Sequence, residues 1–157
     1  MIKPWKIVLP GVATLLAATL LGCAGGGGSP SAAEYEAAIV ETRDSVDSAL
    51  ARIPQAKSED DFLDRLDEAG EVIEAEAGDL DDVGAPERFE DENERLIGHL
   101  RELGAALQGT AEQARVTGFD KLLSGASGLN FESWDKVNAI FRTLRQQGVE
   151  VRPLARH

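Results

Sequence analysis

Residues 86–117 read PERFEDENERLIGHLRELGAALQGTAEQARVT, a sequence with the pattern of a long amphipathic helix. Apolar and small residues recur in it at alternating steps of four and three, which places them on one face of an α-helix. Pro86 suits the first turn, and the carboxylates that follow suit the positive end of the helix dipole. The stretch predicts a long helix that ends at about Thr117 or extends as far as Leu123. Its stripe consists of Phe89, Asn93, Leu96, Leu100, Leu103, Leu107 and Thr110.

Two earlier stretches repeat the same spacing. The first follows Ser31-Ala32-Ala33-Glu34, which has the spacing of a capping box, and ends at Pro54. The second follows Ser58 and runs to Val83-Gly84, so both have ordinary start and stop signals. The sequence therefore predicts two further long helices. Their stripes are Tyr35, Ile39, Thr42, Val46, Ala49 and Ile53, and then Phe62, Leu66, Ala69, Ile73, Ala77 and Leu80.

A shorter helix is expected after the loop at Gly125-Ala126-Ser127-Gly128, with Asn130 as its cap and Gly148 as its stop. Residues 149–157 then form a basic tail, which can be extended. The predicted fold class is all-α, an up-and-down bundle of three long helices plus a shorter C-terminal helix. The stripes also suit a coiled-coil oligomer, but short turns let them pack within one chain. The inward residues of the last helix are Trp134, Val137, Phe141 and Leu144.

Composition indicates one domain with an aliphatic core and an uneven charge. The chain has 157 residues with five Phe, two Trp and one Tyr, and a formal net charge of -12. Residues 31–94 hold 22 Asp or Glu against 5 Lys or Arg, a net of -17, whereas residues 95–157 have a net of +3. So acidic a half argues against nucleic-acid binding. It favours cations or a basic protein surface as partners.

The N-terminal segment has the pattern of an export signal. Lys3 and Lys6 precede an apolar stretch over residues 7–21, which is shorter than the roughly 20 residues of a bilayer span. Leu20-Leu21-Gly22-Cys23 then resembles the lipobox of bacterial lipoprotein precursors. This resemblance implies a diacylglyceryl group on Cys23, cleavage before it, and attachment to the extracytoplasmic face of the cell membrane. An uncleaved anchor and an ordinary signal peptide are the alternatives.

The expected organisation is a lipoprotein signal peptide over 1–22, a Gly/Ser tether over 23–33 and an acidic helical-bundle domain over 34–157. Since Cys23 is the single cysteine, the domain has no disulfide. The segment from Leu80 through Pro86 to His99 also resembles small exported helical lipoproteins of high-GC Gram-positive bacteria. That resemblance implies the architecture and adds little about activity.

The joint between the second and third helices is a candidate calcium site. Residues 79–90 resemble an EF-hand loop, with Asp79 and Asp81 at its first and third positions, Gly84 at the sixth and Glu90 at the twelfth. Val83 at the fifth position supplies no oxygen ligand, which departs from the pattern. A plain helix-to-helix turn is the favoured interpretation, and calcium held by Asp79, Asp81 and Glu90 is the alternative.

Three further features are interpreted as structural. His99 has Glu102 one turn later but no second histidine in a helix, so we expect a surface or half-buried histidine rather than a metal ligand. A seam of mostly small residues beside the third stripe predicts close helix packing, with a groove for a ligand or helix as the alternative. The seam is Ile97, Gly104, Ala111 and Gly118, and the aromatic residues taken as core are Phe131, Trp134 and Phe141.

The residue inventory argues against an enzyme. Lipidation would consume the only thiol, no histidine is flanked by a serine and an acid, and no glycine-rich phosphate loop follows a strand. We therefore expect no catalytic residues and no cofactor. The expected function is that of a membrane-tethered lipoprotein whose helical domain binds a protein or cell-envelope component; weak calcium or ligand binding at the joint is the alternative.

Overall fold

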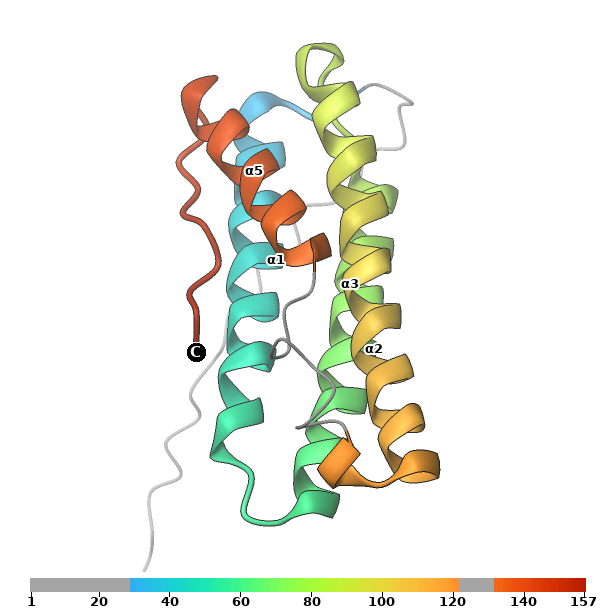
Figure 1. The fold of residues 1–157 in the computed structure, drawn as a ribbon. Coiled ribbons are helices and arrows are strands. Elements are labelled where there is room, and N and C mark those ends of the chain that lie inside the picture. The colour runs from blue at the N-terminus through green and yellow to red at the C-terminus, as the bar shows by residue number, and fades with distance from the viewer. Residues whose placement is uncertain (1–28, 122–131) are drawn as a thin grey trace, which may run out of the picture.

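The computed structural model describes residues 29–121 and 132–157, and within them the chain is all-α with no strand (Figure 1). The predicted fold class is confirmed. Three long helices and a shorter C-terminal one are present, with 3₁₀ turns at two joints. The elements are α1 Ala32–Arg52, η1 Ile53–Gln55, α2 Glu59–Val83, η2 Glu87–Phe89, α3 Glu90–Thr117 and α5 Glu132–Gln146.

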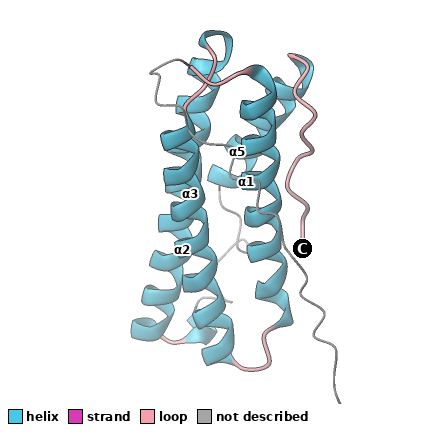
Figure 2. Ribbon diagram, turned by 180° about the vertical axis from the view of Figure 1, so that it is seen from behind, coloured by secondary structure: helices cyan, strands magenta, loops and turns pink. Residues whose placement is uncertain are grey.

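The three long helices run up and down beside one another. α2 packs against both α1 and α3, and α5 packs against α3, over one half of the bundle (Figures 1 and 2). The chain beyond α5 turns back and runs alongside α1 (Figure 1). Short joints between antiparallel neighbours explain this arrangement, because each apolar stripe meets the next one along the chain.

Local signals set the helix starts and stops. The Ser31 side chain accepts from the Glu34 backbone N–H at 3.3 Å, and the Glu34 carboxylate accepts from the Ser31 N–H at 2.9 Å, so the capping box is formed. The Ser58 hydroxyl likewise caps α2 by accepting from the Asp61 N–H. Gly84 ends α2 with a φ of 71°, a left-handed value that disfavours other residues.

The third helix differs slightly from its prediction. Pro86 precedes the 3₁₀ turn η2, so the regular α-helix begins only at Glu90. It ends at Thr117, because Gly118 takes a φ of 94° there, and the longer alternative to Leu123 is wrong. The predicted loop over 125–128 and the Asn130 cap lie outside the described residues.

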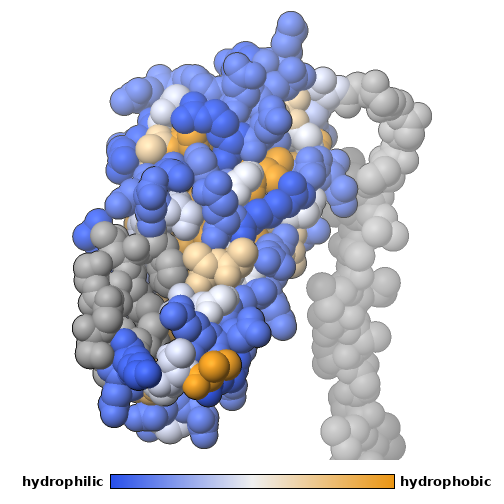
Figure 3. Space-filling view, turned by 45° about the vertical axis from the view of Figure 1, so that its right-hand side comes forward, coloured by the Kyte–Doolittle hydropathy of each residue, from blue (hydrophilic) through white to orange (hydrophobic). Residues whose placement is uncertain are grey.

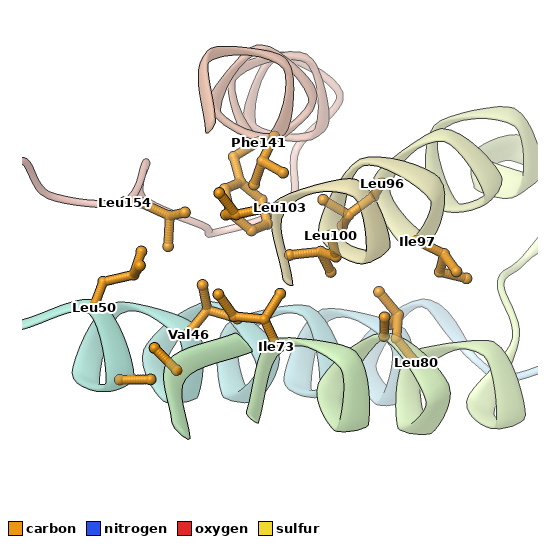
Figure 4. Packing of buried hydrophobic residues seen from close by; sticks show 14 of the residues in the cluster. Val46, Leu50, Ile73, Leu80, Leu96, Ile97, Leu100, Leu103, Phe141 and Leu154 are labelled. Carbon is orange, nitrogen blue, oxygen red and sulfur yellow. The ribbon is translucent and has the colours of Figure 1, made fainter. Parts of the chain in front are cut away.

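The predicted stripes form one hydrophobic core. Nearly all of their members are buried, while Phe62, Thr110 and Trp134 are half-buried. Figure 4 shows side chains of all four helices converging between the elements. At one end of the core Tyr35 stacks on Phe89, with ring centroids 5.2 Å apart. Of the three aromatic residues taken as core, Trp134 and Phe141 are packed in or against it, as predicted, and Phe131 lies outside the described residues.

Residues 149–157, here named the C-terminal strap, are extended as the sequence allowed, but they are also part of the core. Val149, Val151 and Leu154 are each at most 4% exposed. Leu154 lies at the same end of the core as Leu50 of α1 (Figure 4). The sequence interpretation as a basic tail missed this burial.

Hydrogen bonds fix the strap along α1 and α5. Asn138 of α5 accepts from the Leu154 N–H at 2.7 Å through Oδ1. From α1, Arg43 donates to the Pro153 carbonyl at 3.1 Å, and Asp47 accepts from the Ala155 N–H at 2.7 Å. Side chains of helices therefore satisfy backbone groups that an extended segment cannot satisfy by itself.

The capping box predicts a pH-dependent contribution to stability. Hydrogen bonds from the Ser31 hydroxyl and N–H hold the pKa of Glu34 below its usual value. Because the folded-state pKa is lowered, this contribution is complete above the unfolded-state pKa and is lost as pH falls through the folded-state pKa. Glu34→Gln should lower the midpoint of thermal unfolding at pH 7 and make no difference near pH 2. Glu36→Gln is the control, and equal shifts in the two variants would contradict the prediction.

Candidate interaction surface

Helix α2 carries more Asp and Glu residues than any other helix in the described part of the chain. Between residues 59 and 83 there are twelve Asp or Glu and one basic residue, Arg65. The core side of the helix is fixed by its buried residues, such as Leu66 and Ile73. The helical period therefore places many of the carboxylates on the opposite, solvent side.

Five of these carboxylates have ion-pair partners. Arg115 of α3 binds both Asp64 and Asp67, which lie one turn apart on α2. The remaining three pairs link α2 to α1, to itself and to α3: Glu68 with Arg52, Asp61 with Arg65, and Asp81 with Arg101. Because these groups are largely exposed, each pair contributes modestly to stability.

Six other carboxylates of α2 are exposed and have no ion pair in the part of the chain that the structure describes. We name them the acidic face. Figure 3 shows hydrophilic residues covering most of the molecule on the side where α2 and α3 come forward. Since no cation within residues 29–121 and 132–157 forms an ion pair with them, they repel one another and attract positive charge from outside. The acidic face comprises Glu59, Asp60, Glu71, Glu74, Asp79 and Asp82.

The joint after α2 has the geometry of a turn rather than of a calcium loop. Helix α2 continues through Val83, so the first five positions of the aligned loop, with Asp79 and Asp81, are helical. Asp81 pairs with Arg101 of α3 at 2.8 Å, and Glu90 starts α3. Across residues 29–121 and 132–157, no three His, Cys, Asp or Glu side chains are grouped so that they could hold a metal ion. Calcium binding here stays a prediction, which calorimetric titration with millimolar calcium tests.

A groove of about 730 Å³ lies at the same joint, between the end of α2 and the start of α3. Its lining includes Asp81, Glu90, Asn93 and Arg101. Asn93 is 6% exposed, and its Oδ1 has no hydrogen-bond partner among the described residues. The groove therefore combines both signs of charge with one unsatisfied buried acceptor, and it selects no single ligand chemistry.

His99 is half-buried, as predicted, and belongs to a small polar cluster. Its Nδ1 lies 3.1 Å from an oxygen of Glu102, which is also 3.8 Å from the Lys136 ammonium of α5. The hydrogen bond with His99, together with the charge of Lys136, lowers the pKa of Glu102. The cluster joins α3 to α5, which is a structural role.

The predicted small-residue seam is a close contact between helices. Ile97, Gly104 and Ala111 are buried, whereas Gly118 ends α3 and is exposed. A Cβ atom on Gly104 would lie 2.9 Å from the carbonyl oxygen of Gly70 in α2. Sequence reasoning missed Gly70, although a glycine inside a helical stripe can signal such an approach. Close packing is thus confirmed at Gly104, and the groove alternative does not apply there.

No protein-family model matches the chain, and comparisons with curated proteins and with solved structures found no significant similarity. None of the helices in the two described ranges combines the length and hydrophobicity that crossing a membrane requires. Cys23 and the segment before it lie outside those ranges. The candidate functional features are therefore the acidic face of α2 and, from sequence alone, Cys23.

Proposed function

We propose that this protein is an exported lipoprotein, anchored to the extracytoplasmic face of the membrane through Cys23. Its helical domain acts without catalysis and binds a basic protein or cell-envelope component through the acidic face. The observation that carries the proposal is the set of six exposed carboxylates on α2 that have no ion pair in the described part of the chain.

The sequence supports the anchor. A positive start, a short apolar stretch and the Leu20-Leu21-Gly22-Cys23 motif stand in the order of a lipoprotein precursor. Two acyl chains on Cys23 would provide stable attachment, since one chain alone binds a bilayer only marginally. Residues 23–33 would then connect the anchor to α1 as a Gly-rich tether.

The charge distribution supports binding of a basic partner. The acidic face extends along α2 from Glu59 to Asp82, and its carboxylates form no ion pair with the described residues. Complementary charge mainly raises the association rate and selects the partner, and both effects weaken as salt screens the charges. A partner with a row of Lys or Arg side chains therefore fits this surface better than an acidic or apolar one.

The attachment prediction concerns Cys23. We expect the wild-type chain to fractionate with membranes and to carry diacylglyceryl on a new N-terminal Cys23. Cys23→Ala should abolish this modification, because only a thiol forms the thioether. Mass spectrometry of membrane-extracted protein checks it. An intact Met1 on the membrane-bound wild type, or a wild-type Cys23 without lipid, would refute the anchor.

The binding prediction concerns the acidic face. Glu71→Gln, Glu74→Gln, Asp79→Asn and Asp82→Asn combined should reduce crosslinking to partners in intact cells at least fivefold. The same variant should weaken binding of a decalysine peptide, measured by calorimetry at low and at physiological salt. The reduction follows from removing four charges that no partner in the described structure neutralises.

A matched variant tests whether location matters rather than net charge. Glu41, Glu112, Asp120 and Glu150 are exposed carboxylates outside α2, and replacing all four by the corresponding amides makes the same change in net charge. We expect this control to keep most of the crosslinking, with circular dichroism showing that both variants are folded. Equal losses in the two variants would show a general charge effect and end the proposal for the acidic face.

A further inference from the structure

An apolar pocket of about 170 Å³ lies at the end of the bundle where α1 meets α2. Its volume compares with that of an engineered cavity of about 150 Å³ that takes up benzene. Four elements supply its apolar walls: α1 with its following turn, α2, α3 and α5. The wall residues are Leu50, Ile53, Pro54, Phe62, Leu66, Leu107 and Trp134.

One polar group of this lining is unsatisfied. The Trp134 indole Nε1–H is buried and has no hydrogen-bond partner among the described residues. His157, at the end of the C-terminal strap, also lines the pocket, but its Nε2 lies 3.3 Å from a carboxylate oxygen of Asp47. The pocket thus offers an apolar volume of about the size of one ring with one free donor on its wall.

The chemistry of the lining limits which class of molecule can bind in the pocket. A donor that is buried without an acceptor costs free energy, and apolar walls gain dispersion contacts when an apolar group packs against them. A water molecule is held well only where two to four polar partners surround it, and this lining is mostly apolar. A small apolar molecule with one acceptor oxygen would restore both kinds of contact.

We propose that this pocket binds a small, uncharged apolar molecule of about one ring in size that carries a hydrogen-bond acceptor, and that the Trp134 N–H donates to this acceptor. The proposal is independent of the anchor and of the acidic face, since none of their residues lines the pocket.

The test uses two probes of nearly the same shape, acetophenone, which has a carbonyl oxygen, and ethylbenzene, which has none. The full chain in detergent micelles is titrated with each probe, and NMR follows the methyl signals of Ile53 and Leu107. Both probes should shift these methyl signals saturably, whereas only acetophenone should move the Trp134 indole N–H signal downfield. Probe partitioning into micelles is the same for all variants and cancels in their comparison.

Trp134→Phe removes the donor and keeps an aromatic wall. It should weaken acetophenone binding about fivefold and leave ethylbenzene binding unchanged. Tyr35→Phe is the matched control, because it removes another buried polar group that does not line the pocket, and it should leave both affinities unchanged. If Trp134→Phe is not folded, the wild-type protein still tests the proposal, because the Trp134 indole N–H signal should move downfield with acetophenone and not with ethylbenzene.

Three outcomes would overturn the proposal. Neither probe produces a saturable shift at the two methyl groups, which would mean that the pocket is closed to ligands. Both probes bind Trp134→Phe as they bind the wild type, which would make the pocket a packing void without acceptor selection. A long-lived water contacts the Trp134 N–H in water-exchange spectra and acetophenone does not displace it, which would assign the pocket to water.

Discussion

Gly104→Ala is expected to lower the free energy of unfolding by about 1–3 kcal/mol, although alanine is the better helix former. The added Cβ would lie 2.9 Å from the Gly70 carbonyl oxygen and 2.9 Å from Cγ of Glu74. The Glu74 side chain can rotate away, but the carbonyl belongs to the backbone of α2. Helices α2 and α3 must therefore move apart along their interface. Urea denaturation measures the change.

Matched glycine-to-alanine substitutions on the same helix should change the free energy of unfolding in the opposite direction. A Cβ on Gly98 or on Gly109 would have no neighbouring atom within 4 Å. Gly98→Ala and Gly109→Ala should each raise the free energy of unfolding by up to about 1 kcal/mol, because alanine has less backbone freedom to lose. A Gly104→Ala protein as stable as these two would show that the helices are not in close contact at this position.

The reciprocal change at Gly70 tests the same contact from the other side. A Cβ there would lie 2.8 Å from the Gly104 carbonyl oxygen and 2.6 Å from Cγ of Gln108. Gly70→Ala should also destabilise the protein. The double variant should lose less than the sum of the single changes, since the first separation of the helices relieves the second clash.

Leu154→Ala is expected to lower the free energy of unfolding by about 2–3 kcal/mol, although the residue is fourth from the C-terminus. Its side chain is 4% exposed and packs in the core, and its N–H donates to Asn138. Removing three buried carbon atoms loses the hydrophobic free energy of burying them and leaves a cavity between the strap and the helices.

Arg152→Ala provides the control within the strap, because its side chain is exposed and it lies two residues before Leu154. Its effect should stay within about 0.5 kcal/mol. Hydrogen exchange of the Leu154 amide should also be slower than that of the Arg152 amide. If Leu154→Ala is as stable as Arg152→Ala, the strap is detached in solution and does not belong to the core.

Most helices could be predicted because their signals are local. The apolar stripe from Phe89 to Leu107 repeats at the helical period, and the capping box of Ser31 and Glu34 lies within four residues. The turn at Gly84 could also be predicted from the sequence, since the residue that ends this helix takes a positive φ, which favours glycine. The structure begins α3 about one turn later than the sequence predicts, because Pro86 can precede a 3₁₀ turn as readily as an α-helix.

The candidate sites were less predictable because they depend on which residues meet. The spacing of Asp79, Asp81 and Glu90 fits a loop only if α2 ends before Asp79, and tertiary packing of Leu80 keeps the helix intact to Val83. The apolar pocket brings together Phe62 of α2 and Trp134 of α5, which are far apart in the sequence, and no sequence spacing predicts that contact.

The helical class, the buried stripes, most helix ends and the excess of acidic residues on α2 follow from the sequence alone, because each depends on a helical period or on residues a few positions apart. The contact of Gly70 with Gly104, the burial of the strap and the unpaired Trp134 N–H at a pocket depend instead on how the helices pack. An extended segment such as residues 149–157 has no repeating pattern of internal hydrogen bonds, so its position depends on the surfaces of α1 and α5. The pattern of residues 86–117 predicts a helix there, whereas the close approach of α2 explains why residue 104 of that helix is glycine.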